Sequence, residues 1–120
     1  MATKQTEYGM IEISTTAIAT LVSYTVTRTY GVVGMATSNL ASDIAATISR
    51  DPHRGVDVTI NDNNIEIELY VVLEYGTRIA SVATSIINSV RYTVEKHSGM
   101  PVKSVSVHVQ GLRISNRDDK

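Results

Sequence analysis

The clearest pattern in the chain is an alternation of apolar and polar residues between positions 56 and 74. A period of two is typical of a β-strand that buries one face. The alternation is interrupted at residues 61–64, Asn-Asp-Asn-Asn, which tolerate the left-handed backbone of a tight turn. The pattern therefore predicts a β-hairpin with one buried face and one acidic face. Its apolar positions are Val56, Val58, Ile60, Ile65, Ile67, Leu69, Val71 and Leu73.

Two longer segments repeat their apolar residues every three to four positions, which predicts amphipathic helices. The first runs over about 15–29, with Ser14 as its N-cap and Gly31 just past its end. The second runs over about 77–97 and is followed by Gly99 and Pro101, a common stop pattern. The stripes are Ile18, Leu21, Val22, Thr25 and Val26 in the first helix and Ile79, Val82, Ala83, Ile86, Ile87, Val90 and Val94 in the second.

Shorter elements complete the predicted order β-α-(β)-α-β-β-α-β. Residues 8–14 and 102–110 alternate as strands do. The apolar run 31–36 is interpreted as a strand or a tight buried connection, and 38–50 as a helix that Pro52 ends. Helices packed on one face of a mixed sheet would bury every apolar stripe. The predicted fold class is therefore α+β, a single domain with a mixed β-sheet over residues 8–115. A flexible N-terminus is predicted at 1–7 and a flexible tail at 116–120.

Composition narrows the function classes. The chain has 120 residues, enough for one core, and its formal net charge of −1 predicts neither nucleic acid nor an anionic membrane as a partner. It has no cysteine, which excludes a disulfide framework, a thiolate nucleophile and a cysteine-based zinc site. The polar first residues do not resemble a signal peptide, and no apolar run reaches about 18 residues. The prediction is a cytoplasmic protein without a membrane span.

Short motifs stand in a characteristic order at positions 8–14 (YGMIEIS), 30–36 (YGVVGMA), 72–79 (VLEYGTRI) and 90–111. Their order and spacing resemble the bacterial alkaline shock (envelope stress response) protein family, closest to its short YloU-like branch. The resemblance implies Gram-positive-type bacteria, a role in envelope homeostasis, protein partners, and a location that is cytoplasmic or peripheral to the membrane through a partner. Larger members form assemblies, so a homo-oligomer is one expectation, although this chain lacks their long charged extensions. The resemblance implies no catalytic residues.

The helical segments are unusually poor in charge. Arg28 is the one charged residue from Ile13 to Ser42, and residues 79–90 contain none. Because a solvated helix normally carries charges on its outer face, small uncharged faces predict burial against another surface, with Tyr24 and Tyr92 as anchors. The alternatives are that both helices are simply solvated or that they pack against each other. The candidate protein interface consists of Thr16, Thr20, Ser23, Tyr24, Thr27, Ser81, Ser85, Asn88 and Tyr92.

Two features raise a small RNA- or nucleotide-binding module as an alternative. Residues 31–34, Gly-Val-Val-Gly, have the Gly-x-x-Gly spacing of KH-domain loops. Both central residues are valine, which favours a packing role for these glycines. Arg50, His53 and Arg54 form a compact basic loop that could hold a phosphate or an acidic partner.

The acidic side of the predicted hairpin raises an enzyme as a second alternative. Paired carboxylates can carry out acid–base chemistry or bind a hard cation, but a solvated sheet face has the same pattern. Lys103 or His108 beside these carboxylates would favour ion pairs instead. The carboxylates concerned are Asp57, Glu66, Glu68 and Glu74.

The three histidines, His53, His97 and His108, do not have metal-ligand spacing, so neither a metal nor a cofactor is predicted. No sequence-defined nucleophile and base pair is present either. The primary prediction is therefore a non-enzymatic interaction or assembly module in the envelope stress response or envelope lipid homeostasis.

Overall fold

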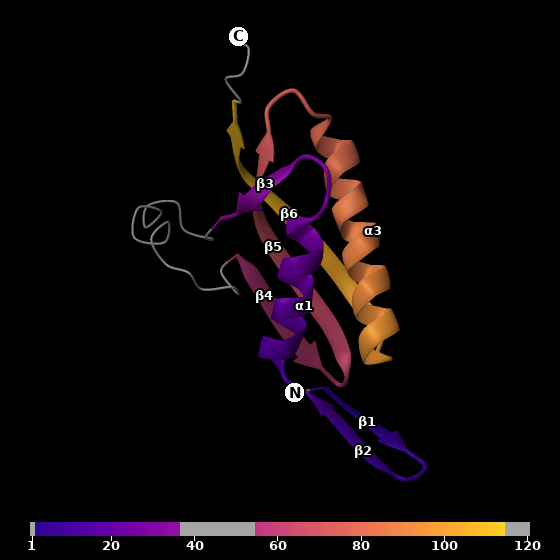
Figure 1. Cartoon of the computed structure of the whole chain (residues 1–120). Coiled ribbons are helices and arrows are strands. Elements are labelled where there is room, and N and C mark those ends of the chain that lie inside the picture. Colours follow the sequence, from indigo (N-terminus) through magenta and orange to yellow (C-terminus); the bar gives the residue numbers. More distant parts are fainter. Residues whose placement is uncertain (1, 37–54, 115–120) are drawn as a thin grey trace.

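A computed structural model describes residues 2–36 and 55–114 (Figure 1). The described elements are β1 (Ala2–Thr6), β2 (Gly9–Ile13), α1 (Thr15–Thr27), β3 (Val32–Met35), β4 (Val56–Asn61), β5 (Asn64–Glu74), α3 (Ile79–Ser98) and β6 (Val102–Arg113). The predicted helix at 38–50, the basic loop with Arg50, His53 and Arg54, and the predicted tail at 116–120 lie outside the described residues.

Strand β5 is the centre of a mixed sheet. β4 pairs with it antiparallel through the predicted turn, where Asp62 and Asn63 have φ of 52° and 65°. β6 pairs with the other side of β5 in parallel, after the crossover through α3. β3 pairs antiparallel with the second half of β5, so β3 and β4 lie end to end along the same side. The prediction of an α+β domain with a mixed sheet is confirmed.

Both described helices cover the same face of this sheet (Figure 1). The inward residues of β5 are completely buried beneath them, whereas Glu66, Glu68 and Tyr70 point to the opposite face, which no described helix covers and which is here called the uncovered face. The core is aliphatic, as expected for a chain without phenylalanine or tryptophan. Its fully buried larger side chains are Ile18, Val22, Val26, Ile65, Ile67, Leu69, Val71, Leu73, Ile86, Val90 and Val94.

The helix boundaries follow their predicted signals. The Ser14 hydroxyl accepts a hydrogen bond from the Ala17 N–H at 3.1 Å and so caps α1. Helix α3 ends at Gly99, whose φ of 75° places it in the left-handed region. Among the described helices, none is long and apolar enough to cross a membrane.

Residues 2–6 of the segment predicted to be a flexible N-terminus form a strand that the sequence analysis does not predict. Ala2–Thr6 forms β1, which pairs antiparallel with β2 so that Gln5 lies opposite Met10. Backbone hydrogen bonds to β2 hold this strand, so it needs no apolar face of its own and leaves no alternating pattern in the sequence. The resulting hairpin, here called the arm (residues 2–13), projects from one end of a molecule with dimensions of 60 × 29 × 18 Å (Figure 1).

Ala36 and Gly55, the described residues on either side of positions 37–54, both lie beside Tyr70. The Ala36 N–H donates to the Tyr70 carbonyl at 2.8 Å, and the Tyr70 N–H donates to the Gly55 carbonyl at 2.9 Å. These bonds make β3 and β4 two parts of one edge, although 18 residues (37–54) separate Ala36 from Gly55 in the sequence.

Candidate functional site

The candidate interface lies on the helical layer, on the side away from the sheet. Helices α1 and α3 lie side by side over the sheet (Figure 1). All nine predicted interface residues are exposed except Ser23, which is half-buried. We call these nine residues the helical surface. The two helices also contact each other. Because eight of the nine residues remain exposed in the described structure, this contact does not bury the uncharged faces.

Hydroxyl groups on the helical surface are turned back onto the helix. Thr20 Oγ1 donates to the Thr16 carbonyl at 3.0 Å, and Thr27 Oγ1 donates to the Ser23 carbonyl at 2.9 Å. A threonine whose hydroxyl is bonded in this way presents its methyl group to the outside. At these two positions the hydroxyl already has a hydrogen-bond partner, so covering Thr20 and Thr27 would not leave their donors unpaired.

Two tyrosines rise from the helical surface, one on each helix. Tyr24 and Tyr92 are 61% and 65% exposed. The Arg28 guanidinium lies 4.9 Å from the centre of the Tyr24 ring, and Lys96 Nζ lies 5.6 Å from that of Tyr92. Such cation–π contacts at exposed positions contribute about 0.5–1 kcal/mol. They bias the orientation of both rings while leaving them open to a partner.

The uncovered sheet face brings the predicted carboxylates next to basic residues of β6. Lys103 Nζ lies 3.7 Å from Glu66 Oε2, and His108 Nε2 lies 3.1 Å from Glu68 Oε1. The β5–β6 register, with Glu68 opposite Ser106, creates both contacts. The sequence analysis expected a lysine or histidine beside these carboxylates if they form ion pairs. Both Lys103 and His108 lie there, which favours the ion-pair interpretation of this face.

Tyr70 and His108 form a stacked pair that the sequence analysis did not identify. Their ring centres are 4.7 Å apart with an interplanar angle of 13°, and the Tyr70 hydroxyl donates to Glu68 Oε1 at 3.2 Å. Both residues occupy polar positions of predicted strands, but 38 positions separate them. Only the parallel register of β5 and β6 shows that they face each other.

Glu68 is expected to control the ionisation of Tyr70. Partial desolvation on the sheet raises the pKa of the Tyr70 phenol above its ordinary value of 10.0, and the hydrogen bond to Glu68 and its negative charge raise it further. Replacing Glu68 by glutamine should lower this pKa towards 10.0. Tyrosine Cζ chemical shifts followed by NMR between about pH 8 and 12 would measure it. The control is Glu66→Gln, which changes a carboxylate two residues before Glu68 in β5 and should leave the pKa of Tyr70 unchanged. Equal pKa shifts in both variants would contradict the role of Glu68.

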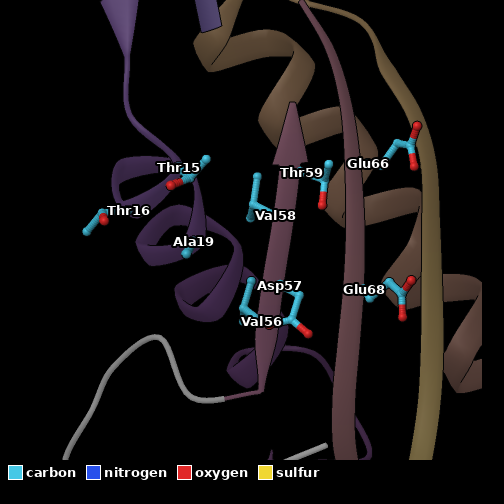
Figure 2. A pocket seen from close by; sticks show the side chains of 9 residues that line it. All are labelled: Thr15, Thr16, Ala19, Val56, Asp57, Val58, Thr59, Glu66 and Glu68. Atoms are coloured by element: carbon cyan, nitrogen blue, oxygen red, sulfur yellow. The ribbon is translucent and has the colours of Figure 1, made fainter. Parts of the chain in front are cut away.

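A hollow of about 540 Å³ lies at the β4 edge of the sheet. Figure 2 shows the start of α1 on one side of β4 and the acidic side chains of β5 on the other. The carboxylates of Glu66 and Glu68 are turned towards β6, where Lys103 and His108 lie, and not towards α1 (Figure 2). Within residues 2–36 and 55–114, no three histidine, aspartate or glutamate side chains come together as a potential metal site.

The KH-like interpretation requires residues 31–34 to form a loop, and the structure does not support this. Val32 pairs with Leu73 and Gly34 with Val72, so most of this segment is strand β3. The Gly31 carbonyl accepts a hydrogen bond from the Glu74 N–H at 2.8 Å. The interpretation that these glycines serve a turn and close packing holds for Gly31, which has a φ of 92° and where a Cβ would lie 3.0 Å from Val82 Cγ2. It does not hold for Gly34, where a Cβ would meet nothing within 4 Å. The other half of that alternative, the loop with Arg50, His53 and Arg54, is not among the described residues.

Comparison with known proteins gives a family and several relatives. Residues 3–114 match the alkaline shock protein 23 family, described as having a cell envelope-related function. The uncharacterised protein YloU of Bacillus subtilis is 39% identical over 114 residues, which are 93% of this chain and 95% of YloU. The uncharacterised protein Spy1614 of Streptococcus pyogenes is 33% identical over 111 residues, 91% of this chain and 92% of that protein. No solved structure matches the chain.

Proposed function

This chain belongs to the alkaline shock protein 23 family, which has a cell envelope-related function, and on that premise we propose that it is a non-enzymatic interaction module. In this proposal the helical surface binds a partner protein. The partner would be membrane-associated and hold the module at the periphery of the membrane, in keeping with the family description. The envelope stress response is the setting we propose for this contact.

The observation that carries the proposal is the uncharged, exposed helical surface. Helix α1 contains no charged residue, and the first half of α3, residues 79–90, contains none either. Covering such a surface avoids the desolvation cost of burying charges, which is several kcal/mol per ion. The inward-turned threonine hydroxyls lower the cost further. Tyr24 and Tyr92 supply the large amphipathic side chains that anchor protein interfaces.

Chemistry on the acidic sheet face is the competing interpretation, and the ion pairs there support the proposal. A general acid or base needs a carboxylate that is free to exchange a proton with a substrate. Glu66 and Glu68 instead face Lys103 and His108 across the β5–β6 pair. Exposed pairs of this kind are common surface features that contribute about 0–1 kcal/mol each.

Negative charges placed on the helical surface should abolish partner binding without unfolding the protein. The proposed variant is Thr20→Glu/Asn88→Glu, which changes one exposed residue on each helix. Unpaired charges buried in the contact should weaken binding by about tenfold or more. The measurement is affinity capture from soluble and membrane fractions of the native organism's lysate, with quantitative mass spectrometry of the captured proteins.

The control is Asn61→Glu/Ser104→Glu, which adds the same charge on exposed positions of the sheet. It should capture the same partners as the wild type. A partner lost with the control and kept with the helical variant would move the binding site to the uncovered sheet face. A partner set unchanged in both would reject the helical surface.

A further inference from the structure

The arm exposes apolar residues that the rest of the protein does not cover. Tyr8 is 93%, Met10 54% and Ile11 45% exposed. Between the arm and the remainder of the described chain, the hydrogen bonds are those of the Thr3 N–H to Asn63 Oδ1 and of Lys4 Nζ to the Gly99 carbonyl. A two-stranded hairpin is marginally stable alone in water. An apolar arm with so few contacts is expected to gain stability when it is covered.

The opposite end of the molecule carries a hollow of about 560 Å³ between the end of α1 and the start of α3. It is lined mainly by apolar surface, with Tyr30 and Val82 among its walls and Arg78 at the start of α3. Ser81 forms part of its helical wall. The arm leaves from the start of α1 (Figure 1). The lining of the end hollow instead includes Thr29 and Tyr30, which follow the last turn of α1. The 13 residues of α1 separate them by about 20 Å.

The arm and the end hollow are complementary in charge as well as in polarity. The arm carries Glu7 and Glu12 against a single Lys4, and Lys4 is directed at the Gly99 carbonyl of its own chain. The end hollow presents Arg78, and Arg28 caps the nearby end of α1. An apolar, acidic hairpin tip therefore matches an apolar cavity with a positively charged rim.

We propose that the arm of one copy of this protein docks in the end hollow of a second copy. The rigid helix between the two features keeps the arm from its own hollow, so the contact forms between chains. Because donor and acceptor are different surfaces of the same chain, the contact is head-to-tail, and it extends into a chain of copies or closes into a ring. This inference rests on the proposed function, a module that acts through protein contacts, and it names a second copy as one partner.

Two variants that are each defective in self-association should together form a dimer. Tyr8→Ser/Met10→Ser removes the apolar tip of the arm, and Ser81→Glu places a negative charge in the hollow. In sedimentation velocity over a concentration series, the wild type should associate progressively, and each variant should associate at least about tenfold more weakly. Mixed in equal amounts, the first variant offers an intact hollow and the second an intact arm, so a one-to-one dimer should form and grow no further.

The controls separate docking from misfolding. A glutamate at position 81 lies in the first turn of α3, where the helix dipole favours a negative charge, so Ser81→Glu should fold normally. Thr84→Glu adds the same charge on the same helix outside the hollow and should associate like the wild type. A wild type that stays monomeric, a mixture that stays monomeric, or association lost equally in Thr84→Glu would overturn the docking.

The Thr20→Glu/Asn88→Glu variant distinguishes this inference from the proposed function, because neither residue lines the end hollow. It should lose the captured partner and still self-associate like the wild type. If the mixture fails to dimerise while this variant still loses its partner, the docking alone is rejected. If the mixture dimerises while partner capture is unaffected, the helical surface alone is rejected.

Discussion

Replacing Leu69 by alanine is expected to destabilise the protein by about 2–5 kcal/mol. Leu69 is completely buried in β5, between Val56 of β4 and Val107 of β6. Truncation removes the transfer free energy of the side chain and leaves a cavity beneath both helices. A loss of this size is a large part of the roughly 5–15 kcal/mol that stabilises a domain. Urea unfolding should show a lower midpoint with an unchanged slope, because the surface exposed on unfolding stays the same.

Leu112→Ala is the matched control, since it makes the same chemical change in β6 at a side chain that is 44% exposed. It should cost less than about 1 kcal/mol. Equal losses in the two variants would contradict the assignment of β5 as the centre of the core. The comparison needs no assumption about function, because it measures the free energy of unfolding of the domain that carries both the helical surface and the arm.

Elements with one buried face could be predicted from the sequence. The alternation around Leu69 and Glu68 gave the β4–β5 hairpin, because burial of one face selects an apolar residue at every second position. The stripe of α3 and the stop at Gly99 gave the crossover helix in the same way. These signals are local. Each shows which side of a segment is buried in the core, but not which distant segment packs against it.

Features set by long-range pairing could not be predicted. Strand β1 is polar and exposed, and only its hydrogen bonds to β2 make it a strand. The pairs Glu66–Lys103 and Glu68–His108 depend on the register between β5 and β6. A slip of one residue would send these side chains to the other face. The end hollow is formed by two connections, after α1 and before α3, that are far apart in the sequence.

The two proposed contacts lie on a surface whose charge is unevenly distributed. Helix α1 and residues 79–90 of α3 carry no charge, whereas the second half of α3 carries Arg91, Glu95 and Lys96. On the other face of the sheet Glu66 and Glu68 lie beside Lys103 and His108. The two contacts share Ser81 and Ser85, which belong to the helical surface and also line the end hollow. A docked arm would therefore cover one end of the helical surface, and self-association and partner binding are expected to compete there.

Gly55→Ala is expected to destabilise the protein by about 2–5 kcal/mol, from about 1–2 kcal/mol of backbone strain and about 1–3 kcal/mol of overpacking. Gly55 has a φ of 82°, and a Cβ there would lie 2.4 Å from the Ala36 carbonyl oxygen and 2.9 Å from that of Tyr70. Both contacts are with backbone, which cannot rotate away as a side chain can. Relief requires β3 and β4 to move apart where they meet on β5. Urea unfolding measures the loss, and amide exchange of Tyr70 should accelerate because its N–H donates to Gly55.

Gly76→Ala measures the backbone-strain part of this effect alone, so the difference between the two variants gives the steric part. Gly76 has a φ of 99°, but a Cβ there meets nothing within 4 Å, so only the backbone strain of about 1–2 kcal/mol should appear. A loss in Gly55→Ala no larger than that in Gly76→Ala would mean that the two halves of the edge are not tightly joined. A larger loss, together with faster exchange at Tyr70, would show that close backbone contacts at Gly55 join β4 to β3 beside Tyr70.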